Sequence, residues 1–412
     1  MGMSFELRPV TPDEVAAFVH TSMTGFGVHV RHPERLELEW TNHELDRTLA
    51  AFDEGEIVGT GRLYSFELTL PGGDLVPVAA VSWISVLPTH RRRGILTEIM
   101  RRQLDDSVAR GESMAVLNAS EGVIYRRFGY GVATNTISFT LDARHSAFLN
   151  PVPAGGRVRI VDDATAGKAF PEIFDRARRV QPGAVSRIPE WWSDQYFWQD
   201  DKEEGARFFV VYESPAHDLD GFASYRILEK WEANLSRSTL QLGDLAAVTP
   251  EAHAALWRYL CDIDLVETIT AWMRPVDEPL RWLLAESRRL HVNHITDELW
   301  VRLLDVPAAL AARRYAAPGR VVFEVADELR PDGAAAGRFA LDAGPDGADA
   351  SRTDAAPDLV LGVADLGAAY LGGVSFSNLA RAGLVEERTP GALARADTMF
   401  RTDPAPFAMT WF

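Results

Sequence analysis

The chain has 412 residues, of which 47% are apolar, and its formal net charge is −17 because 59 acidic side chains outnumber 42 basic ones. This length predicts two to four domains, and the apolar content suffices for several hydrophobic cores, which excludes an intrinsically disordered chain. The negative charge opposes nonspecific binding to nucleic acids and favours cationic partners.

Cys261 is the only cysteine, so an intrachain disulfide and a thiolate zinc site are excluded. The amino-terminal residues MGMSFELRPV contain no apolar stretch of signal-peptide length. No window approaches the roughly 18 uninterrupted apolar residues of a membrane span. We therefore expect a cytoplasmic protein without a metal ion, a membrane span or a nucleic-acid partner.

Residues 1–150 are predicted to form one α/β domain. The Thr-Pro-Asp-Glu sequence beginning at Thr11 provides an N-cap and a first-turn proline for a helix over residues 11–23. Gly111 and Gly129 stand where two further helices are expected to end. The other expected elements are strands at 57–70, 76–87, 114–119 and 131–141 and helices at 94–110 and 121–128.

The segment PVPAGG at 151–156 predicts a linker, because paired prolines and glycines break regular structure. From there to residue 304 the same order of elements recurs, with strands expected at 207–213, 221–228 and 238–247 and helices at 168–179 and 250–263. Glu251 stands where the first copy has arginines, so pyrophosphate binding is not expected here. We interpret 151–304 as a degenerate, structural copy.

Residues 305–412 are predicted to form a third domain, with an alanine-rich helix, a strand at 320–326, further turn-rich strands and two short helical patterns. Residues 358–389 resemble the sterol-carrier-protein-like domain, which elsewhere holds lipids in an apolar tunnel. The same apolar helix also fits an ordinary hydrophobic core.

The most distinctive segment is VSWISVLPTHRRRGILT at 81–97, an apolar strand followed by a turn, three arginines, a glycine and an amphipathic helix. Unpaired N–H groups at the helix start, together with arginine forks, would bind a pyrophosphate. A second strand ends at Asn118 and precedes a short helix that carries Tyr125. This arrangement resembles the Gcn5-related N-acetyltransferases, in which acetyl-CoA lies at the splay between the fourth and fifth strands.

The whole chain resembles the Eis (enhanced intracellular survival) acetyltransferases, which acetylate aminoglycoside amines and protein lysines. The resemblance rests on SVLPTHRRRGILTEIMRRQL, ASEGVIYRRFGYGVAT and the terminal FRTDPAPFAMTWF, and it extends over nearly all of the sequence. It implies an α/β (α+β) chain of two tandem Gcn5-related acetyltransferase folds, the second degenerate, followed by a sterol-carrier-protein-like domain. It also implies a homohexamer and acetyl-CoA as cosubstrate.

The resemblance assigns the cosubstrate contacts to three segments. The pantetheine arm is expected to pair with the backbone of the strand, and the phosphates are expected at the helix start, Arg92 to Thr97. Ser120 and Glu121 are expected to line the thioester end. The motif Arg-x-x-Gly-x-Gly/Ala is met at Arg91 and Gly94, but Leu96 replaces its last small residue. The implied cofactor-binding residues are Ile84, Ser85, Val86, Arg92, Arg93, Gly94, Ile95, Leu96, Thr97, Ser120 and Glu121.

Amide formation from a thioester needs a group that takes the amine proton and one that protonates the leaving thiolate. Tyr125 is the candidate acid, because a phenol with a pKa near 10 is only about 2 kcal/mol uphill from a thiolate near 8.5. The alternative is a tyrosine that anchors the short helix in the core. Tyr130 is expected to pack.

The usual base, a glutamate on the fourth strand, is missing, since residues 76–87 contain no acid. The resemblance fills this gap with the α-carboxylate of Phe412, acting as base through water. The apolar approach FAMTWF is typical of a buried terminus. The alternative is an aromatic plug that only closes the core.

The histidines offer weaker candidates. His291 and His294 lack a nearby third ligand in the sequence, and His29 is a candidate for the acceptor pocket. That pocket is expected to be lined by aromatic and acidic side chains suited to cationic amino sugars. The residues in question are Phe26, Glu37, Glu39, Trp40 and Glu44, which could equally form one amphipathic helix with solvated glutamates.

Three functional hypotheses follow. The first is an acetyl-CoA-dependent N-acetyltransferase that accepts cationic primary amines, with Tyr125 and the Phe412 carboxylate as catalytic groups. The second is a carrier of lipids or other hydrophobic ligands based on the third domain, and the third is a catalytically silent scaffold. Titration with acetyl-CoA separates the first two, because a carrier has no use for the arginine-rich turn.

Overall fold

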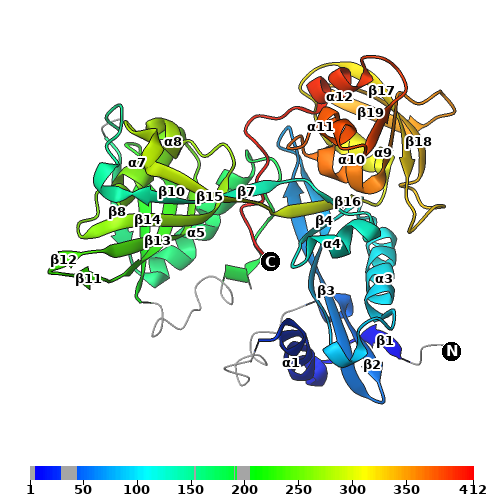
Figure 1. Cartoon of the computed structure of the whole chain (residues 1–412), viewed down its shortest axis with the longest axis horizontal. Helices are drawn as coiled ribbons and strands as arrows, with labels where there is room; N and C mark the ends of the chain where they lie inside the picture. Colours follow the sequence, from blue (N-terminus) through cyan, green and yellow to red (C-terminus); the bar gives the residue numbers. More distant parts are fainter. Residues whose placement is uncertain (1–4, 29–43, 153–154, 190, 193–204) are drawn as a thin grey trace. The chain divides into compact units, whose positions relative to one another are not determined.

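The computed structural model describes residues 5–28, 44–152, 155–189, 191–192 and 205–412. The chain divides into two compact units (Figure 1). The first comprises Met1–Ala133, Leu299–Thr402 and Trp411–Phe412, and the second comprises Thr134–Glu298 and Asp403–Thr410. Each unit is therefore built from segments that are far apart in the sequence.

The first unit contains a seven-stranded sheet in the order β1-β2-β3-β4-β5-β16-β6. Neighbouring strands are antiparallel except β4 and β5, which are parallel and are joined through helix α3. The bounds are β1 Glu6–Pro9, β2 Thr48–Asp53, β3 Glu56–Thr69, β4 Leu75–Val86, β5 Met114–Asn118, β6 Gly131–Val132 and β16 Leu299–Leu303.

Helices α1 (Val15–Phe26) and α3 (Ile95–Ala109) cover opposite faces of this sheet. Ala50 packs in the cluster that holds the α1 residues Phe18 and Val19, whereas its neighbour Ala51 packs with Ile95 and Ile99 of α3. Successive strand residues point to opposite faces, so this alternation places a helix on each side. Short helices α4 (Gly122–Tyr125) and η4 (Arg126–Phe128) follow β5.

The elements expected at 11–23, 57–70, 76–87, 94–110, 114–119 and 121–128 are confirmed within a few residues. Thr11 and Pro12 open a short 3-10 turn, η1 (Pro12–Glu14), in which the Thr11 N–H donates to Glu14 Oε2 at 2.9 Å. Helix α1 follows this turn and ends at Phe26, where Gly27 adopts φ 74° as the C-cap.

The strand expected at 131–141 is wrong as one element, because it divides into β6 and β7 (Asn135–Asp142), which belong to different sheets. Conversely, β16 follows the second sheet in sequence but pairs with β5 and β6 of the first. Thus β16, which follows the expected linker at 151–156, belongs to the first sheet, and β7, which precedes this linker, belongs to the second. The boundaries at 150 and 304 stay a prediction.

The second unit contains the sheet β15-β7-β14-β13-β10-β9-β8. Helix α5 (Asp163–Arg178) packs on one face and α7 (Pro250–Cys261) on the other. β14 and β15 were not expected from the sequence. The strands are β8 Arg157–Val161, β9 Arg207–Glu213, β10 Leu219–Leu228, β13 Ser238–Ala247, β14 Val266–Pro275 and β15 Leu290–Asp297, with a hairpin of β11 Trp231–Glu232 and β12 Leu235–Ser236; short helices are η5 Ala143–His145, α8 Leu280–Leu283 and η7 Ser287–Arg289.

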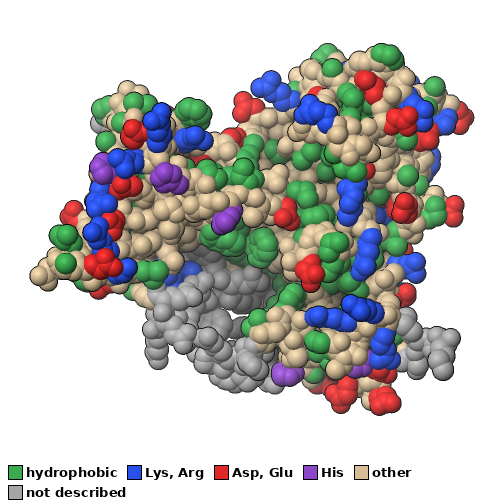
Figure 2. All heavy atoms as spheres, in the orientation of Figure 1, with side chains coloured by type: hydrophobic (Ala, Val, Ile, Leu, Met, Phe, Trp, Pro, Cys, Tyr) green, Lys and Arg blue, Asp and Glu red, His purple; other side chains and the backbone are tan. Residues whose placement is uncertain are grey.

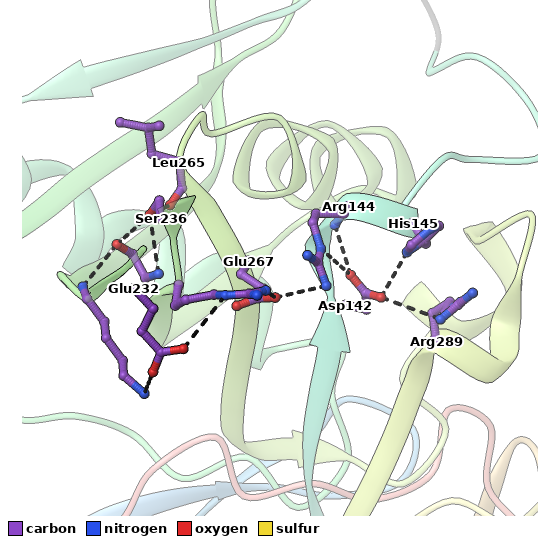
Figure 3. Close-up of polar contacts among 11 residues, drawn as sticks. Asp142, Arg144, His145, Glu232, Ser236, Leu265, Glu267 and Arg289 are labelled. Atoms are coloured by element: carbon purple, nitrogen blue, oxygen red, sulfur yellow. Dashed lines mark hydrogen bonds and ion pairs between the residues drawn. The ribbon is translucent and has the colours of Figure 1, made fainter. Parts of the chain in front are cut away.

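Charged side chains of alternating sign cross one end of this second sheet (Figure 3). Glu267 pairs with Arg237 and, at 2.8 Å, with Arg144. Asp142 lies 2.8 Å from His145 Nδ1 and 3.5 Å from Arg289. These pairs join β7, β14 and the turns beside them, so the loops at this end are fixed to the sheet.

The carboxyl-terminal part of the first unit holds a five-stranded sheet in the order β19-β18-β17-β20-β21. Its core contains the aromatic rings of Phe323, Phe376 and Phe400. The elements are β17 Gly319–Ala326, β18 Gly337–Gly344, β19 Gly347–Arg352, β20 Leu359–Gly362, β21 Val385–Glu387 and the helices α9 Val306–Ala312, α10 Val363–Tyr370, α11 Phe376–Arg381 and α12 Ala392–Phe400. In the part of the chain that the structure describes, no helix is long and apolar enough to cross a membrane.

Candidate active site

Strands β4 and β5 separate where the candidate site begins. Their parallel pairing covers only Ala79–Val81 against Ala115–Leu117, although β4 continues to Val86. On the other side of β4 the register with β3 shifts near Trp83, which has φ 55°. Such a bulge bends the strand away from its neighbour, so the β4 backbone beyond Val81 faces a gap instead of a strand.

The turn after β4 leads into helix α3. Arg92 has φ 63° and Gly94 has φ 84°, and the left-handed backbone at these positions reverses the chain before Ile95 starts the helix. The first four N–H groups of a helix have no partner within the helix, and they form a binding site for an anion. The 15-residue α3 thus begins beside the gap between β4 and β5.

The three arginines of this turn have different surroundings. Arg91 donates to the carbonyl oxygens of Val86 at 3.2 Å and Gly25 at 3.0 Å, which ties the end of β4 to α1. Arg93 donates to Asp53 Oδ2 at 3.0 Å. Arg92 is exposed and has no hydrogen bond or ion pair with any described residue. No described residue therefore competes with an external anion for its guanidinium.

A cavity of about 730 Å³ occupies this region. The strand gap, the arginine-rich turn, the start of α3 and the segment after β5 all contribute to it. Ser85 is buried, and its hydroxyl has no hydrogen-bond partner among the described residues. The lining residues are Gly25, Phe26, Ile84, Ser85, Val86, His90, Arg91, Arg92, Gly94, Ile95, Leu96, Thr97, Ser120, Glu121, Ile124, Tyr125 and Arg127.

Tyr125 stands at the end of α4, and the residue is 5% exposed. Burial raises the pKa of the Tyr125 phenol above its usual value, a hydrogen bond with Ser120 lowers it, and the Glu121 carboxylate raises it further. The net direction is upward, so the hydroxyl carries its proton at neutral pH. A protonated phenol in the cavity wall can act as a general acid.

Comparison with known proteins agrees with this geometry. Acetyltransferase (GNAT) domain models match residues 6–133 and 183–303, and a sterol carrier protein domain model matches residues 306–409. An uncharacterized N-acetyltransferase of Streptomyces avermitilis is 40% identical over 410 residues, which is 98% of this chain and 99% of that protein. The N-acetyltransferase Eis of Mycobacterium tuberculosis is 36% identical over 358 residues, 84% of each chain.

The crystal structure of Eis1 from Mycobacterium abscessus superposes with a TM-score of 0.89 at 39% identity, covering 99% of this chain and 100% of that one. This chain belongs to the Eis family of N-acetyltransferases. The expected fold class is confirmed, with two GNAT domains followed by a sterol carrier protein domain. Acetyltransferases of the GNAT fold use acetyl-CoA.

The cavity of this Eis-family chain brings together most of the cosubstrate residues expected from the sequence. Of the eleven, only Arg93 is missing from the lining, because its side chain turns to Asp53. His90 also approaches Asp53, with 3.3 Å between Nε2 and Oδ2. The Asp53 carboxylate therefore lies between the Arg93 and His90 side chains at the edge of the turn. The binding roles of all eleven residues stay predictions.

Phe412 is absent from the lining but contacts β3 and β5 of the same sheet. Its backbone N–H donates to Oδ1 of Asn118, the last residue of β5, at 3.2 Å. Its ring packs edge-on against Phe66 of β3, with 5.3 Å between centroids. The segment before it, Asp403–Thr410, belongs to the second unit. Phe412 is thus fixed by both backbone and ring, and its role as base stays a prediction.

Arg127 and His90 line the cavity although sequence reasoning did not select them for it. Arg127 stands next to Arg126 in the sequence, and the doublet alone does not show which of the two faces the cavity. Arg127 lies over the Phe128 ring, 5.0 Å from its centroid, and has no ion pair with any described residue. Figure 2 shows Lys and Arg side chains over the part of the first unit where Figure 1 places α3.

The expected acceptor pocket is only partly described. Phe26 lines the cavity, whereas Glu44 accepts from the Ser65 hydroxyl at 2.6 Å and from its N–H at 3.1 Å. His29, Glu37, Glu39 and Trp40 lie outside the described residues. His291 and His294 are exposed on β15, and within the described ranges no group of three or more His, Cys, Asp or Glu side chains could hold a metal ion.

Proposed function

We propose that this chain transfers the acetyl group of acetyl-CoA to primary amines of cationic acceptors, with aminoglycosides as the first class to test and protein lysines as the second. The observation that carries the proposal is the common cavity of the β4 gap, the exposed Arg92, the start of α3 and Tyr125. Backbone, cations and a phenolic acid are the groups that binding and cleaving an acyl thioester require.

The residues present fit an acyl-CoA donor. The β4 backbone from Ile84 to Val86 offers hydrogen-bond groups to the amides of the pantetheine arm, as a neighbouring strand would. The N–H groups at the start of α3 and the guanidinium groups of Arg92 and Arg127 fit the phosphates. These cations stand on a chain whose overall charge is −17, so an anionic donor is attracted to this site in particular.

In the proposed reaction the neutral acceptor amine attacks the thioester carbonyl. The carbon–nitrogen bond forms, the carbon–sulfur bond breaks and the electron pair leaves with sulfur. Before the attack, the proton of the acceptor ammonium passes through water to the Phe412 carboxylate. Tyr125 donates its proton to the departing thiolate, and the second proton, which the attacking nitrogen loses as the amide forms, returns to the Tyr125 oxygen. Because burial raises the pKa of Tyr125, its proton transfer to sulfur is uphill by more than the roughly 2 kcal/mol of an exposed phenol.

The experiment is release of thiol from acetyl-CoA in the presence of an aminoglycoside panel. The full chain is compared with a variant that lacks only Phe412, and acetyl-CoA binding to each is measured by calorimetry. The proposal expects turnover by the full chain and a loss of at least about tenfold in the variant, with the acetyl-CoA dissociation constant preserved. Any tag is placed at the amino terminus, because added residues after Phe412 would move the carboxylate.

Other outcomes separate the parts of the proposal. Equal turnover by both proteins would show that a group other than the Phe412 carboxylate is the base. Acetyl-CoA binding without turnover moves the acceptor class to protein lysines or other amines. An absence of acetyl-CoA binding contradicts the acetyl donor and favours the alternative of a hydrophobic-ligand carrier. The homohexamer and the cytoplasmic location stay predictions, which sedimentation and fractionation measure.

A further inference from the structure

The segment that carries Tyr125 is short. Helix α4 has four residues, no side chain caps its amino terminus, and Val123 in its middle is 84% exposed. Isolated helices shorter than about 12 residues are marginal in water, so a four-residue helix cannot hold a side chain in place by its own hydrogen bonds. The position of Tyr125 therefore depends on what the segment is attached to.

One attachment is Arg126, the residue directly after Tyr125. Its guanidinium lies 2.6 Å from Oδ1 of Asp365, whose side chain is 6% exposed. Asp365 is held in turn by its own helix, α10, because its Oδ2 accepts from the N–H of Gly362 at 3.2 Å. The buried carboxylate thus has one oxygen on the α10 amino terminus and the other on the segment that carries Tyr125.

A second attachment holds the other end of the segment. Arg302 of β16 donates to the carbonyl oxygen of Phe128 and to Oδ2 of Asp327. Oδ1 of Asp327 accepts from the backbone N–H groups of Leu329 and Arg330, both at 3.2 Å. Arg302 and Asp327 are almost fully buried, and such a pair is costly to break from one side.

Glycines bring α10 against the sheet at the same place. A Cβ on Gly131 of β6 would meet the carbonyl oxygen of Ala364, and a Cβ on Gly367 of α10 would meet that of Val301. Both obstacles are backbone, which cannot move aside as a side chain can. Helix α10 therefore packs directly on β6 and β16, and Asp365 has little freedom to shift. Figure 1 shows α10 beside β16.

We infer that Asp365, in the sterol carrier protein domain, is a positioning residue for acyl transfer, because it holds Arg126 and so sets the place of Tyr125 in the cavity wall. The inference rests on the proposed function for its catalytic consequence. In this inference the sterol carrier protein domain supports the reaction by holding Tyr125 in place, and this role does not require the domain to bind a ligand. Arg126 and Arg127 have different roles, because Arg126 binds Asp365 of α10 and Arg127 lines the cavity.

The test compares Asp365→Asn and Arg126→Gln with a matched control, Asp358→Asn. Asp358 is a partly buried carboxylate of the same domain that accepts from the Val322 N–H at 2.9 Å and lies 3.6 Å from Arg395. No hydrogen bond or ion pair joins it to the described residues 121–130. We expect amide hydrogen exchange across 121–130 to become roughly fivefold faster in both test variants and to stay unchanged in the control.

The catalytic readout is the split between kcat and KM. Asp365→Asn and Arg126→Gln are expected to lower kcat about tenfold and to leave KM for acetyl-CoA within about twofold, and the double variant is expected to lose no more than the larger single effect. Unchanged exchange in Asp365→Asn, or an equal kcat loss in Asp358→Asn, overturns the inference. An inactive wild-type chain refutes the proposed function instead, while the exchange measurement still decides the positioning.

Discussion

At the scale of single residues, the two tyrosines after β5 have opposite surroundings. Tyr125 lines the cavity and bonds with Ser120, whereas Tyr130 is fully buried and its hydroxyl has no hydrogen-bond partner among the described residues. Burial raises the pKa of Tyr130 far above its usual value. The rings meet edge-on at 6.4 Å between centroids. Tyr130 is therefore a natural control for substitutions at Tyr125.

Tyr125→Phe is expected to lower kcat by about a hundredfold, because a positioned general acid contributes about 10²–10⁴-fold. The acetyl-CoA dissociation constant is expected to stay within about twofold, since the ring and the arginine-rich turn remain. Turnover in single-turnover assays and binding by calorimetry measure the two quantities.

Tyr130→Phe is the control for that substitution. Removing an unpartnered buried hydroxyl while keeping the ring is expected to be neutral or slightly stabilising and to leave kcat unchanged. If Tyr125→Phe turns over as fast as wild type, Tyr125 is not the acid. If Tyr130→Phe is the slower variant, the acid was assigned to the wrong tyrosine.

At the scale of secondary structure, close approaches through glycine hold α10 against β6 and β16. Gly131→Ala is expected to destabilise the first unit by more than about 3 kcal/mol, because its Cβ would overlap the α10 backbone at Ala364 and Ala368. Differential scanning calorimetry of the full chain measures this as a lowered Tm of one transition.

Gly167→Ala is the control for the glycine substitution. Gly167 lies inside α5, and a Cβ there meets no atom within 4 Å. The substitution is expected to stabilise the second unit by about 0.5–1 kcal/mol, since alanine favours a helix over glycine. Equal Tm values for both variants would contradict the close packing at Gly131.

The sequence predicted the positions of strands and helices better than it predicted which strands pair with each other. The alternation in TISFTL at 136–141 indicates a strand correctly, but nothing local shows that β7 pairs with β14 and β15 instead of with β5. Pairing between distant segments depends on tertiary packing, which period and turn residues do not encode. The short apolar run LWVRL at β16 likewise shows no sign of its place beside β5.

The part of the candidate site that is formed by neighbouring residues in the sequence could be predicted. The strand, the turn and the start of α3 are contiguous in sequence, and the cosubstrate residues named from them line one cavity, except Arg93. Arg126 was not distinguishable from Arg127, because the partner that separates them, Asp365, lies 239 positions away. Contacts of this range can be found only in the folded chain.

At the scale of the whole molecule, the buried carboxyl of Glu298 makes the stability of the second unit depend on pH. Glu298 in the second unit is fully buried, and burial raises the pKa of its carboxyl to about 7, although hydrogen bonds from the Ala408 N–H and the Thr134 hydroxyl lower it. Between its unfolded and folded pKa values the folded chain binds more protons than the unfolded chain. Stability of this unit therefore falls as pH rises through that window.

Denaturant titrations at pH 5 and pH 8 measure this dependence. The second unit of the wild-type chain is expected to lose up to about 3 kcal/mol of unfolding free energy between these values. Glu298→Gln is expected to remove most of the loss while keeping an acceptor for Ala408. Carboxyls whose pKa is lowered in the fold, such as that of Glu213, change the unfolding free energy only below about pH 4.5. They therefore do not contribute to the difference between pH 5 and pH 8. Stability that rises from pH 5 to pH 8 would contradict the assignment.

The strand exchange also sets the order in which the chain can finish folding during its synthesis. β5 ends at Asn118, but β16, which covers its open edge, ends only at Leu303, about 185 residues later. At roughly 5–20 residues per second, the ribosome leaves the apolar edge MAVLN uncovered for about ten to forty seconds. The first sheet to leave the ribosome is thus completed only after β15, the last strand of the second sheet, has been made. For that time the newly made chain depends on whatever protects an open strand.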